Sequence, residues 1–421
     1  MSSTLLLREH APPHPNPDSP FASFWMGGFE CATHRRHDGR RLDCVAATRH
    51  DEFALQDYRR LGEVGMSTAR DGLRWHLIEE RPGFYDWSSI LPQIRAARET
   101  GVQVIWDLFH YGWPDELNIW HPRFVEHFGC FAGAFARLLR DETDETPIFA
   151  PVNEISFFSW GGGDMSFFNP FTRDRGDELK VQLVRASIAA MEAIWDVTPD
   201  ARFVHPDPMI NVLAADEEPE SLETARRYHE CQFAVWDMIA GRLRPELGGK
   251  AEYLDILGAN YYAYNQWLFP GGPGATIAPS DPRYRPVSDL LVELSARYNR
   301  PIILSETGIE FDARPHWLRF IGREARRALK NGVPLEGVCW FPIVNHPGWD
   351  DDRHCHNGMW DYPNEWGERE TCAELERELF EQMALLNSDE DEDDALDLRL
   401  LDRATQSQGD GAAESREDVE A

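Results

Sequence analysis

Short apolar runs alternate with longer stretches of helical periodicity along most of the chain. The apolar runs are rich in β-branched and aromatic residues, which is typical of buried strands. We expect strands at residues 24–28, 66–72, 102–110, 147–153, 201–205, 254–262, 301–306 and 335–341. Between these runs, apolar residues recur every three or four positions, as in helices that bury one face. These stretches predict helices near residues 51–64, 88–100, 122–140, 177–196, 219–242, 286–298, 314–330 and 371–386.

This alternation predicts the fold class, because strands that are separated by helices pair into a parallel sheet. Eight strands with eight helices indicate an α/β protein with a (β/α)8 TIM barrel. No internal repeat and no linker interrupts residues 21–387, so we expect a single barrel domain there. The proline-rich residues 1–20 are expected to form an arm. The acidic residues 388–421 are expected to form a disordered tail, in which LDLRLLD could make a helical turn.

Charge and composition argue against several classes of protein. The chain carries a net charge of −31, so its surface repels nucleic acid and anionic membranes, and we expect neither as a partner. No stretch approaches the roughly 20 consecutive apolar residues of a membrane helix. The first residues lack the pattern of a secretory signal. The seven cysteines are scattered without a CxxC pair, which suits a reducing compartment, so we expect a cytoplasmic protein. The oligomeric state stays open.

Two glutamates stand at the ends of predicted strands. Glu154 follows the run PIFAPVN, and Glu306 ends the run PIILSE. The carboxyl ends of the strands in a parallel barrel meet on one face, where a ligand can bind. The fourth and seventh strands stand on opposite sides of such a barrel, so the two carboxylates can face each other. A pair of carboxylates is the basic equipment for cleaving a glycosidic bond.

At these residues the chain resembles the retaining β-glycosidases of the large (β/α)8 clan, most closely glycoside hydrolase family 1. The pair Asn153-Glu154 matches the Asn-Glu pair after the family's fourth strand. Glu306-Thr307-Gly308 matches the Glu-Asn-Gly motif after its seventh strand. Further matches lie in ARDGLRW, LFHYGW and NYY and on the eighth strand, at Arg70, His110, Asn260, Tyr262 and Trp340.

The resemblance implies a role for each matched residue. It makes Glu154 the acid/base and Glu306 the nucleophile, and it places Asn153 beside the sugar 2-hydroxyl. A nucleophilic carboxylate must stay ionised, so it needs a cation and hydrogen-bond donors, which Arg70 and Tyr262 could supply. The acid must start protonated, which apolar surroundings and a neighbouring negative charge favour. The remaining matched residues are implied to contact the sugar, and they are His110, Asn260 and Trp340.

Three departures from the family concern the residues that read the sugar. A glutamine ends the family's first strand, and alignment places His34 there, with Glu30 nearby. A glutamate that binds the outer hydroxyls has no counterpart in WFPIVNHPGWDDD, where Asp350 or Asp351 could substitute. The asparagine of the Glu-Asn-Gly motif is Thr307. We therefore expect a divergent member whose sugar preference cannot be carried over.

Together these observations predict a retaining β-glycosidase that hydrolyses small β-glycosides through a covalent glycosyl-enzyme intermediate. A transglycosidase would use the same intermediate, and a non-catalytic sugar-binding barrel would explain the altered sugar-reading residues. An inverting hydrolase is a third alternative. The predicted chemistry needs no cofactor and no metal. The cluster His354-Cys355-His356 could bind a metal ion, but no second pair of ligands accompanies it, so we expect no metal site.

Overall fold

Eight parallel strands form a closed barrel in the computed structural model, which describes residues 14–271, 275–386 and 398–405. The order around the barrel is β1-β10-β9-β7-β5-β4-β3-β2, so every strand neighbours the next barrel strand in sequence. The strands are β1 (Trp25–Gly28), β2 (Thr68–Gly72), β3 (Gln103–Asp107), β4 (Ile148–Ala150), β5 (Arg202–Pro208), β7 (Ile256–Asn260), β9 (Ile302–Thr307) and β10 (Leu335–Trp340). The predicted (β/α)8 fold is confirmed.

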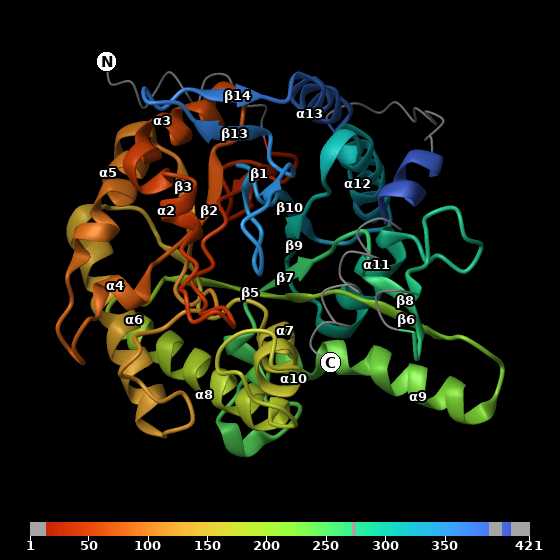
Figure 1. The fold of residues 1–421 in the computed structure, drawn as a ribbon, viewed down its shortest axis with the longest axis horizontal. Helices are drawn as coiled ribbons and strands as arrows, with labels where there is room; N and C mark the ends of the chain where they lie inside the picture. The colour runs from red at the N-terminus through yellow and green to blue at the C-terminus, as the bar shows by residue number, and fades with distance from the viewer. Residues whose placement is uncertain (1–13, 272–274, 387–397, 406–421) are drawn as a thin grey trace.

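Helices surround the barrel on the outside (Figure 1). The longer ones follow the predicted stretches: α3 (His50–Glu63), α5 (Leu91–Thr100), α6 (Arg123–Glu142), α8 (Gly176–Trp195), α9 (Pro219–Glu230), α11 (Val287–Tyr298), α12 (Arg314–Lys330) and α13 (Ala373–Leu386). The stretch expected as one helix at 219–242 is divided. A short 3₁₀ turn separates α9 from α10 (Ala234–Ile239). α9 projects to one side of the molecule (Figure 1), and only Ala225 of its residues is buried.

Apolar side chains fill the inside of the barrel. This inner cluster is distinct from the larger core between strands and helices, and its members include Met26, Ile105, Ile148, Val204, Ile256, Ile303 and Cys339. The strands are buried on both faces, which explains why their sequences read as continuous apolar runs rather than as alternating ones. The packed interior leaves the carboxyl ends of the strands as the place for polar chemistry.

The fifth strand is longer than the expected 201–205, because the segment Pro206-Asp207-Pro208 continues it. Residues 204–208 of β5 pair in register with β7. The amide of Met209 donates to the carbonyl of Asn260 on β7. Successive backbone nitrogens of a strand point alternately to its two neighbours, so the nitrogens of Pro206 and Pro208 point toward β4. β4 ends at Ala150, so the missing proline N–H groups cost no strand pairing.

Shorter elements lie at the carboxyl end of the barrel and at its periphery. After β4, the helix α7 (Ile155–Phe158) leads into a π-helical turn, and α2 (Cys44–Ala47) and α4 (Trp75–Ile78) follow β1 and β2. Three two-stranded sheets complete the described fold: β6 (Asn211–Ala214) with β8 (Gln266–Phe269), β11 (His346–Pro347) with β12 (His354–Cys355), and β13 (Trp360–Pro363) with β14 (Arg369–Thr371).

Part of the acidic carboxyl-terminal segment is helical. Residues 398–405, within the segment expected to be a disordered tail, form a helix whose Leu401 is buried. The carboxylate of Asp402 accepts hydrogen bonds from the amide and hydroxyl of Ser280. Most of residues 1–20 and the rest of the expected tail lie outside the described residues, so the division into arm, barrel and tail stays a prediction. No helix of the described part is long and apolar enough to cross a membrane.

Candidate active site

Glu306 lies on β9 at the carboxyl end of the barrel and is 5% exposed. Nη1 of Arg70 donates to its Oε1 over 2.7 Å, and the hydroxyl of Tyr262 donates to its Oε2 over 2.8 Å. Both carboxylate oxygens are therefore held by donors, one of them cationic. Such contacts favour the ionised form of a carboxyl group and fix its orientation.

Glu154 follows β4 and starts the short helix α7, in a left-handed backbone conformation with φ of 43°. Its amide donates to the carbonyl of Pro206, which ties this conformation to β5. The carboxylate of Asp207, also on β5, accepts hydrogen bonds from the amide and hydroxyl of Ser156. These contacts fasten the first turn of α7 to the barrel, so the direction of the Glu154 side chain is set by two neighbouring strands.

The Glu154 carboxyl group has two hydrogen-bond donors and a raised pKa. The hydroxyl of Tyr111 donates to Oε2 over 2.6 Å, and Nδ2 of Asn260 donates to Oε1 over 2.9 Å. Burial and the negative charge of Glu306 nevertheless raise the pKa of Glu154 to about 8. At neutral pH Glu154 is therefore mostly protonated, which is the starting state of a general acid.

Arg70 connects Glu306 to Asn153, the residue before Glu154. It lies on β2, has no exposed surface, and donates from Nη2 to Oδ1 of Asn153 over 2.7 Å as well as to Glu306. The same Nη2 lies 2.8 Å from Oδ2 of Asp107 on β3. Burial alone would lower the pKa of Arg70, but the charges of Asp107 and Glu306 raise it well above its usual value. The guanidinium is thus a fixed positive charge under the nucleophile candidate.

Asn153 and His110 form a second layer of contacts around Glu154. Nδ2 of Asn153 donates to Nε2 of His110 over 3.1 Å and to the hydroxyl of Tyr111 over 3.0 Å. The Nδ1 of His110 lies 3.1 Å from the carboxylate of Asp107. Burial lowers the pKa of His110, but the Asp107 carboxylate and the charge of Glu30 outweigh this and raise it. Both ring nitrogens of His110 therefore have protein partners.

One cluster at the base of the site has the side chains of a metal site. Suitable ligand atoms of Cys31, Asp107 and His110 lie within 4.8 Å of one another, and all three residues are buried. The Asp107 carboxylate is already paired with Arg70, however, and that guanidinium would repel a cation at this position. Burial also raises the pKa of the Cys31 thiol well above its usual value, so it is not a thiolate. The cluster therefore suits hydrogen bonding better than metal binding.

Aromatic side chains line the site above the two carboxyl groups. Tyr264 stacks on Tyr262 with ring centroids 5.7 Å apart and is 39% exposed. Trp349 packs against Tyr111 with ring centroids 5.3 Å apart. Trp340 ends β10 beside Thr307 and is only 1% exposed, and its indole N–H donates to the carbonyl of Asn357 over 3.0 Å. Aromatic faces of this kind suit the apolar faces of sugars.

Seven of the ten residues predicted for the site lie in one connected group of hydrogen bonds: Glu154, Glu306, Arg70, His110, Asn153, Asn260 and Tyr262. Trp340 lies next to this group, because it pairs in register with the residue that follows Glu306. The neighbouring strands β7 and β9 are also linked by a side-chain contact. The hydroxyl of Ser305 donates to Oδ1 of Asn260, the residue that holds Glu154.

His34 and Asp350 lie outside this group. His34 has no exposed surface and packs against Trp349, with ring centroids 4.7 Å apart, and burial lowers its pKa to about 3. The side chain of Asp350 is exposed, and among the described residues it makes no hydrogen bond or ion pair with the group around Glu154. Glu30 comes closer than either, with Oε1 3.6 Å from Nε2 of His110. Sugar contacts by His34 and Asp350 stay predictions.

The sequence analysis missed three residues that hold the predicted ones. Tyr111 and Asn260 are the donors to Glu154, and although Tyr111 stands in the matched stretch LFHYGW, only Asn260 was assigned a role. Asp107 balances the charge of Arg70, and Ser305 orients Asn260. Asp107 ends β3, Tyr111 lies in the loop that follows it, and Ser305 lies within β9 directly before Glu306. All three are close to matched residues in the sequence, although nothing in the sequence named their partners.

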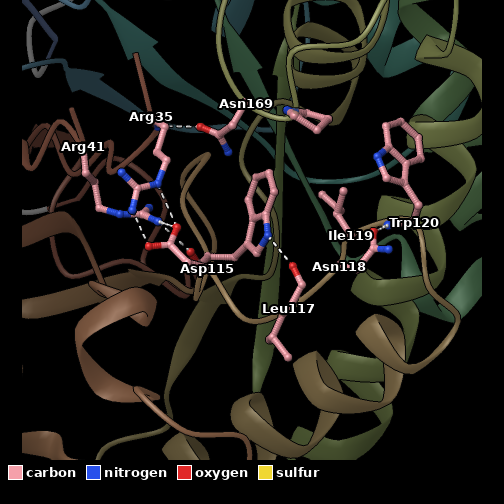
Figure 2. A pocket seen from close by; sticks show the side chains of 10 residues that line it. Arg35, Arg41, Asp115, Leu117, Asn118, Ile119, Trp120 and Asn169 are labelled. Atoms are coloured by element: carbon pink, nitrogen blue, oxygen red, sulfur yellow. Dashed lines mark hydrogen bonds and ion pairs between the residues drawn. The ribbon is translucent and has the colours of Figure 1, made fainter. Parts of the chain in front are cut away.

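A separate cleft of about 190 Å³ lies beside the site, on the loops that follow β1 and β3 (Figure 2). The carboxylate of Asp115 pairs with Arg35 and Arg41 on one side of it (Figure 2), and Trp113 is among the residues that line it. Nδ2 of Asn169 donates to the carbonyl of Tyr111 over 3.1 Å, which connects the wall of the cleft to the residue that holds Glu154. The cleft therefore combines charged and amide side chains with the indole of Trp113, next to the group that holds Glu154.

The fold is similar to those of solved β-glucosidases. A family 1 β-glucosidase from Thermotoga maritima aligns with a TM-score of 0.72 and 16% identity over 90% of this chain and 100% of that one. A β-glucosidase from Thermotoga maritima in complex with castanospermine gives 0.71 and 15% over 90% and 100%. The AHE enzyme from Alicyclobacillus herbarius gives 0.70 and 18% over 81% and 88%. At this level of identity the likeness establishes a shared fold.

Comparison at the level of sequence adds no relative. No protein-family model matches the chain, and no curated protein matches it. The functional argument therefore depends on the side chains at the carboxyl end of the barrel.

Proposed function

We propose that this protein is a retaining β-glycosidase, with Glu306 as the nucleophile and Glu154 as the acid/base. One observation carries the proposal: the two carboxyl groups have opposite environments. Arg70 and Tyr262 donate to Glu306, whereas burial and the Glu306 charge raise the pKa of Glu154 to about 8. Two titratable groups whose surroundings push their protonation states apart are the usual sign of an acid paired with a nucleophile.

In the first half of the reaction, Glu306 attacks the anomeric carbon while Glu154 gives its proton to the leaving oxygen. Arg70 donates to the attacking carboxylate and fixes its direction. The hydrogen bond from Tyr262 to Oε2 holds the second oxygen of the same carboxylate. The products of this half-reaction are the free aglycone and a glycosyl ester of Glu306.

In the second half, Glu154 acts as the base that activates water. Esterification removes the charge of Glu306, which after burial is the largest cause of the raised pKa of Glu154. The hydrogen bonds from Tyr111 and Asn260 then favour the ionised form. The same side chain can therefore serve as acid and then as base, and water attack releases the sugar with its original anomeric configuration.

The direct test is chemical labelling of the nucleophile. We expect a panel of nitrophenyl β-glycosides to contain at least one substrate, and a matching 2-fluoro glycoside to add its sugar mass to the peptide that contains Glu306. Glu306→Gln should lower kcat by at least about 10³-fold. The matched control is Glu336→Gln, because Glu336 is a buried glutamate near the start of β10, at the opposite end of the barrel strands.

The alternatives give different outcomes in the same experiment. Turnover with inversion and no adduct would indicate an inverting hydrolase. Sugar binding without turnover or adduct across the panel would indicate a non-catalytic sugar-binding barrel. Sugar transfer to an added alcohol in preference to water would identify a transglycosidase that uses the same two glutamates.

A further inference from the structure

Two histidines lie on the same side of a short strand outside the active site. His354 and His356 flank Cys355 at β12, and side chains two positions apart in a strand point to the same face. Cys355 points the other way and is 3% exposed. The two imidazole rings stack with centroids 4.3 Å apart. Two imidazole rings, which are common metal ligands, therefore lie side by side.

The fold adds a carboxylate that is not adjacent in the sequence. Asp361 lies on β13, and its Oδ1 is 2.7 Å from Nε2 of His354. One ligand atom from each of His354, His356 and Asp361 lies within 4.8 Å of the other two. The amide of Tyr362 donates to Oδ1 of Asp361 over 2.7 Å, which orients the carboxylate. The side chains of Asp361 and His354 are about one third exposed, so an ion can reach them.

Nε2 of His354 is shielded from solvent, and its close polar neighbour is the Asp361 carboxylate. Zn–N and Zn–O bonds are each about 2.0–2.2 Å long, so the two atoms would separate slightly to bind one ion as neighbouring ligands. Tyr362 stacks on the His354 ring with centroids 4.5 Å apart and fixes its plane.

We propose that His354, His356 and Asp361 bind a divalent transition-metal ion, with Zn²⁺ as the first choice. Imidazole is a preferred ligand of zinc, copper and nickel, whereas magnesium and calcium prefer sites built from oxygen. Three protein ligands leave a further position for water. The sequence analysis dismissed a metal at the His354-Cys355-His356 cluster because no further ligands were evident, and the position of Asp361 supplies the third one.

The site is connected to the proposed active site by the backbone. The carbonyl of His356 accepts a hydrogen bond from the amide of Phe311, which follows β9 and Glu306. The next carbonyl, that of Asn357, accepts the indole N–H of Trp340. A bound ion fixes the two histidines and therefore holds this loop against the elements that carry Glu306 and Trp340.

Metal binding can be measured without a substrate. The full chain is stripped with a chelator and titrated with Zn²⁺ by calorimetry, with the melting temperature recorded in parallel. We expect one ion per chain and a higher Tm when the ion is bound. His356→Ala and Asp361→Asn should each weaken binding at least about tenfold. His316→Ala, at a half-buried histidine on α12, should leave binding unchanged.

Two further measurements guard against misfolded variants and adventitious binding. The metal-free variants should melt close to the metal-free wild type, because Asp361→Asn preserves the shape of the side chain. Binding should weaken between pH 7.5 and pH 5.5, because a ligating imidazole must be neutral. The proposal is overturned if the wild type binds no Zn²⁺, or if the variants bind it as tightly as the wild type.

Discussion

The phenolic oxygen of Tyr111 lies 2.6 Å from Oε2 of Glu154 and donates a hydrogen bond to it. The same oxygen accepts a hydrogen bond from Nδ2 of Asn153 over 3.0 Å. Burial and Glu306 raise the pKa of Glu154, whereas the hydrogen bond from Tyr111 acts in the opposite direction. Tyr111 is therefore a positioning residue: it orients the carboxyl group of Glu154 and lowers the pKa of this proposed acid/base.

Tyr111→Phe should raise the pKa of Glu154 further, because the substitution removes a donor that favours the ionised carboxylate. We expect a shift of roughly one unit above the value of about 8. The falling alkaline limb of kcat/KM reports the acid of the free enzyme, so it should move to higher pH. An unchanged limb would show that Tyr111 only packs against the site. Tyr284→Phe is a control, because its hydroxyl contacts Tyr261 rather than Glu154.

Removal of the Glu306 charge should have the opposite effect on Glu154. The negative charge of Glu306 is the second cause of the raised pKa after burial. Glu306→Ala, with turnover restored by azide as an external nucleophile, should therefore show an alkaline limb below about pH 8, shifted by roughly one unit or more. If azide-supported turnover keeps the limb of the wild type, the two carboxyl groups do not interact as the structure indicates.

Arg70→Met should impair both stability and turnover. The substitution leaves the carboxylate of Asp107 buried without its cationic partner, which typically costs about 3–5 kcal/mol of unfolding free energy. Glu306 also loses its charged donor. Urea unfolding and nitrophenyl glycoside assays measure the two effects. Arg202→Met is the control, because the Arg202–Asp255 pair is partly exposed and should contribute at most about 1 kcal/mol.

A buried histidine should make stability depend on pH. Nδ1 of His50 lies 2.8 Å from Asp57 and its Nε2 lies 2.9 Å from Asp71. Burial alone would lower the pKa of His50, but the two carboxylates outweigh it and raise the pKa to about 9. Because an unfolded histidine titrates near pH 6.5, the stabilisation is fully present below about pH 6.5 and is lost as pH rises through about 9.

The expected loss is about 3 kcal/mol of unfolding free energy between pH 6.5 and pH 9.5, measured by urea unfolding at both values. His50→Gln should be less stable at pH 6.5 and should lose much less on raising the pH. Equal slopes for wild type and variant over this range would contradict a charged His50.

The barrel and its two glutamates could be predicted from the sequence, since each depends on local pattern. Every barrel strand lies within or overlaps a predicted run, because strands that are buried on both faces are apolar throughout. The extension of β5 through Pro206 and Pro208 could not be predicted. Proline argues against a strand unless the neighbouring strand has already ended, and that depends on the length of β4.

The partners of the catalytic candidates were decided by tertiary structure alone. Tyr111 is 43 residues from Glu154 in the sequence and Asn260 is 106 residues away, yet both donate to its carboxylate. The approach of Asp361 to His354 depends likewise on how the last strands fold back. The sequence by itself determined where strands end and which acidic side chains stand there, because hydrophobic burial is set locally. Which donors reach those side chains depends on closure and register of the barrel, which no local pattern encodes.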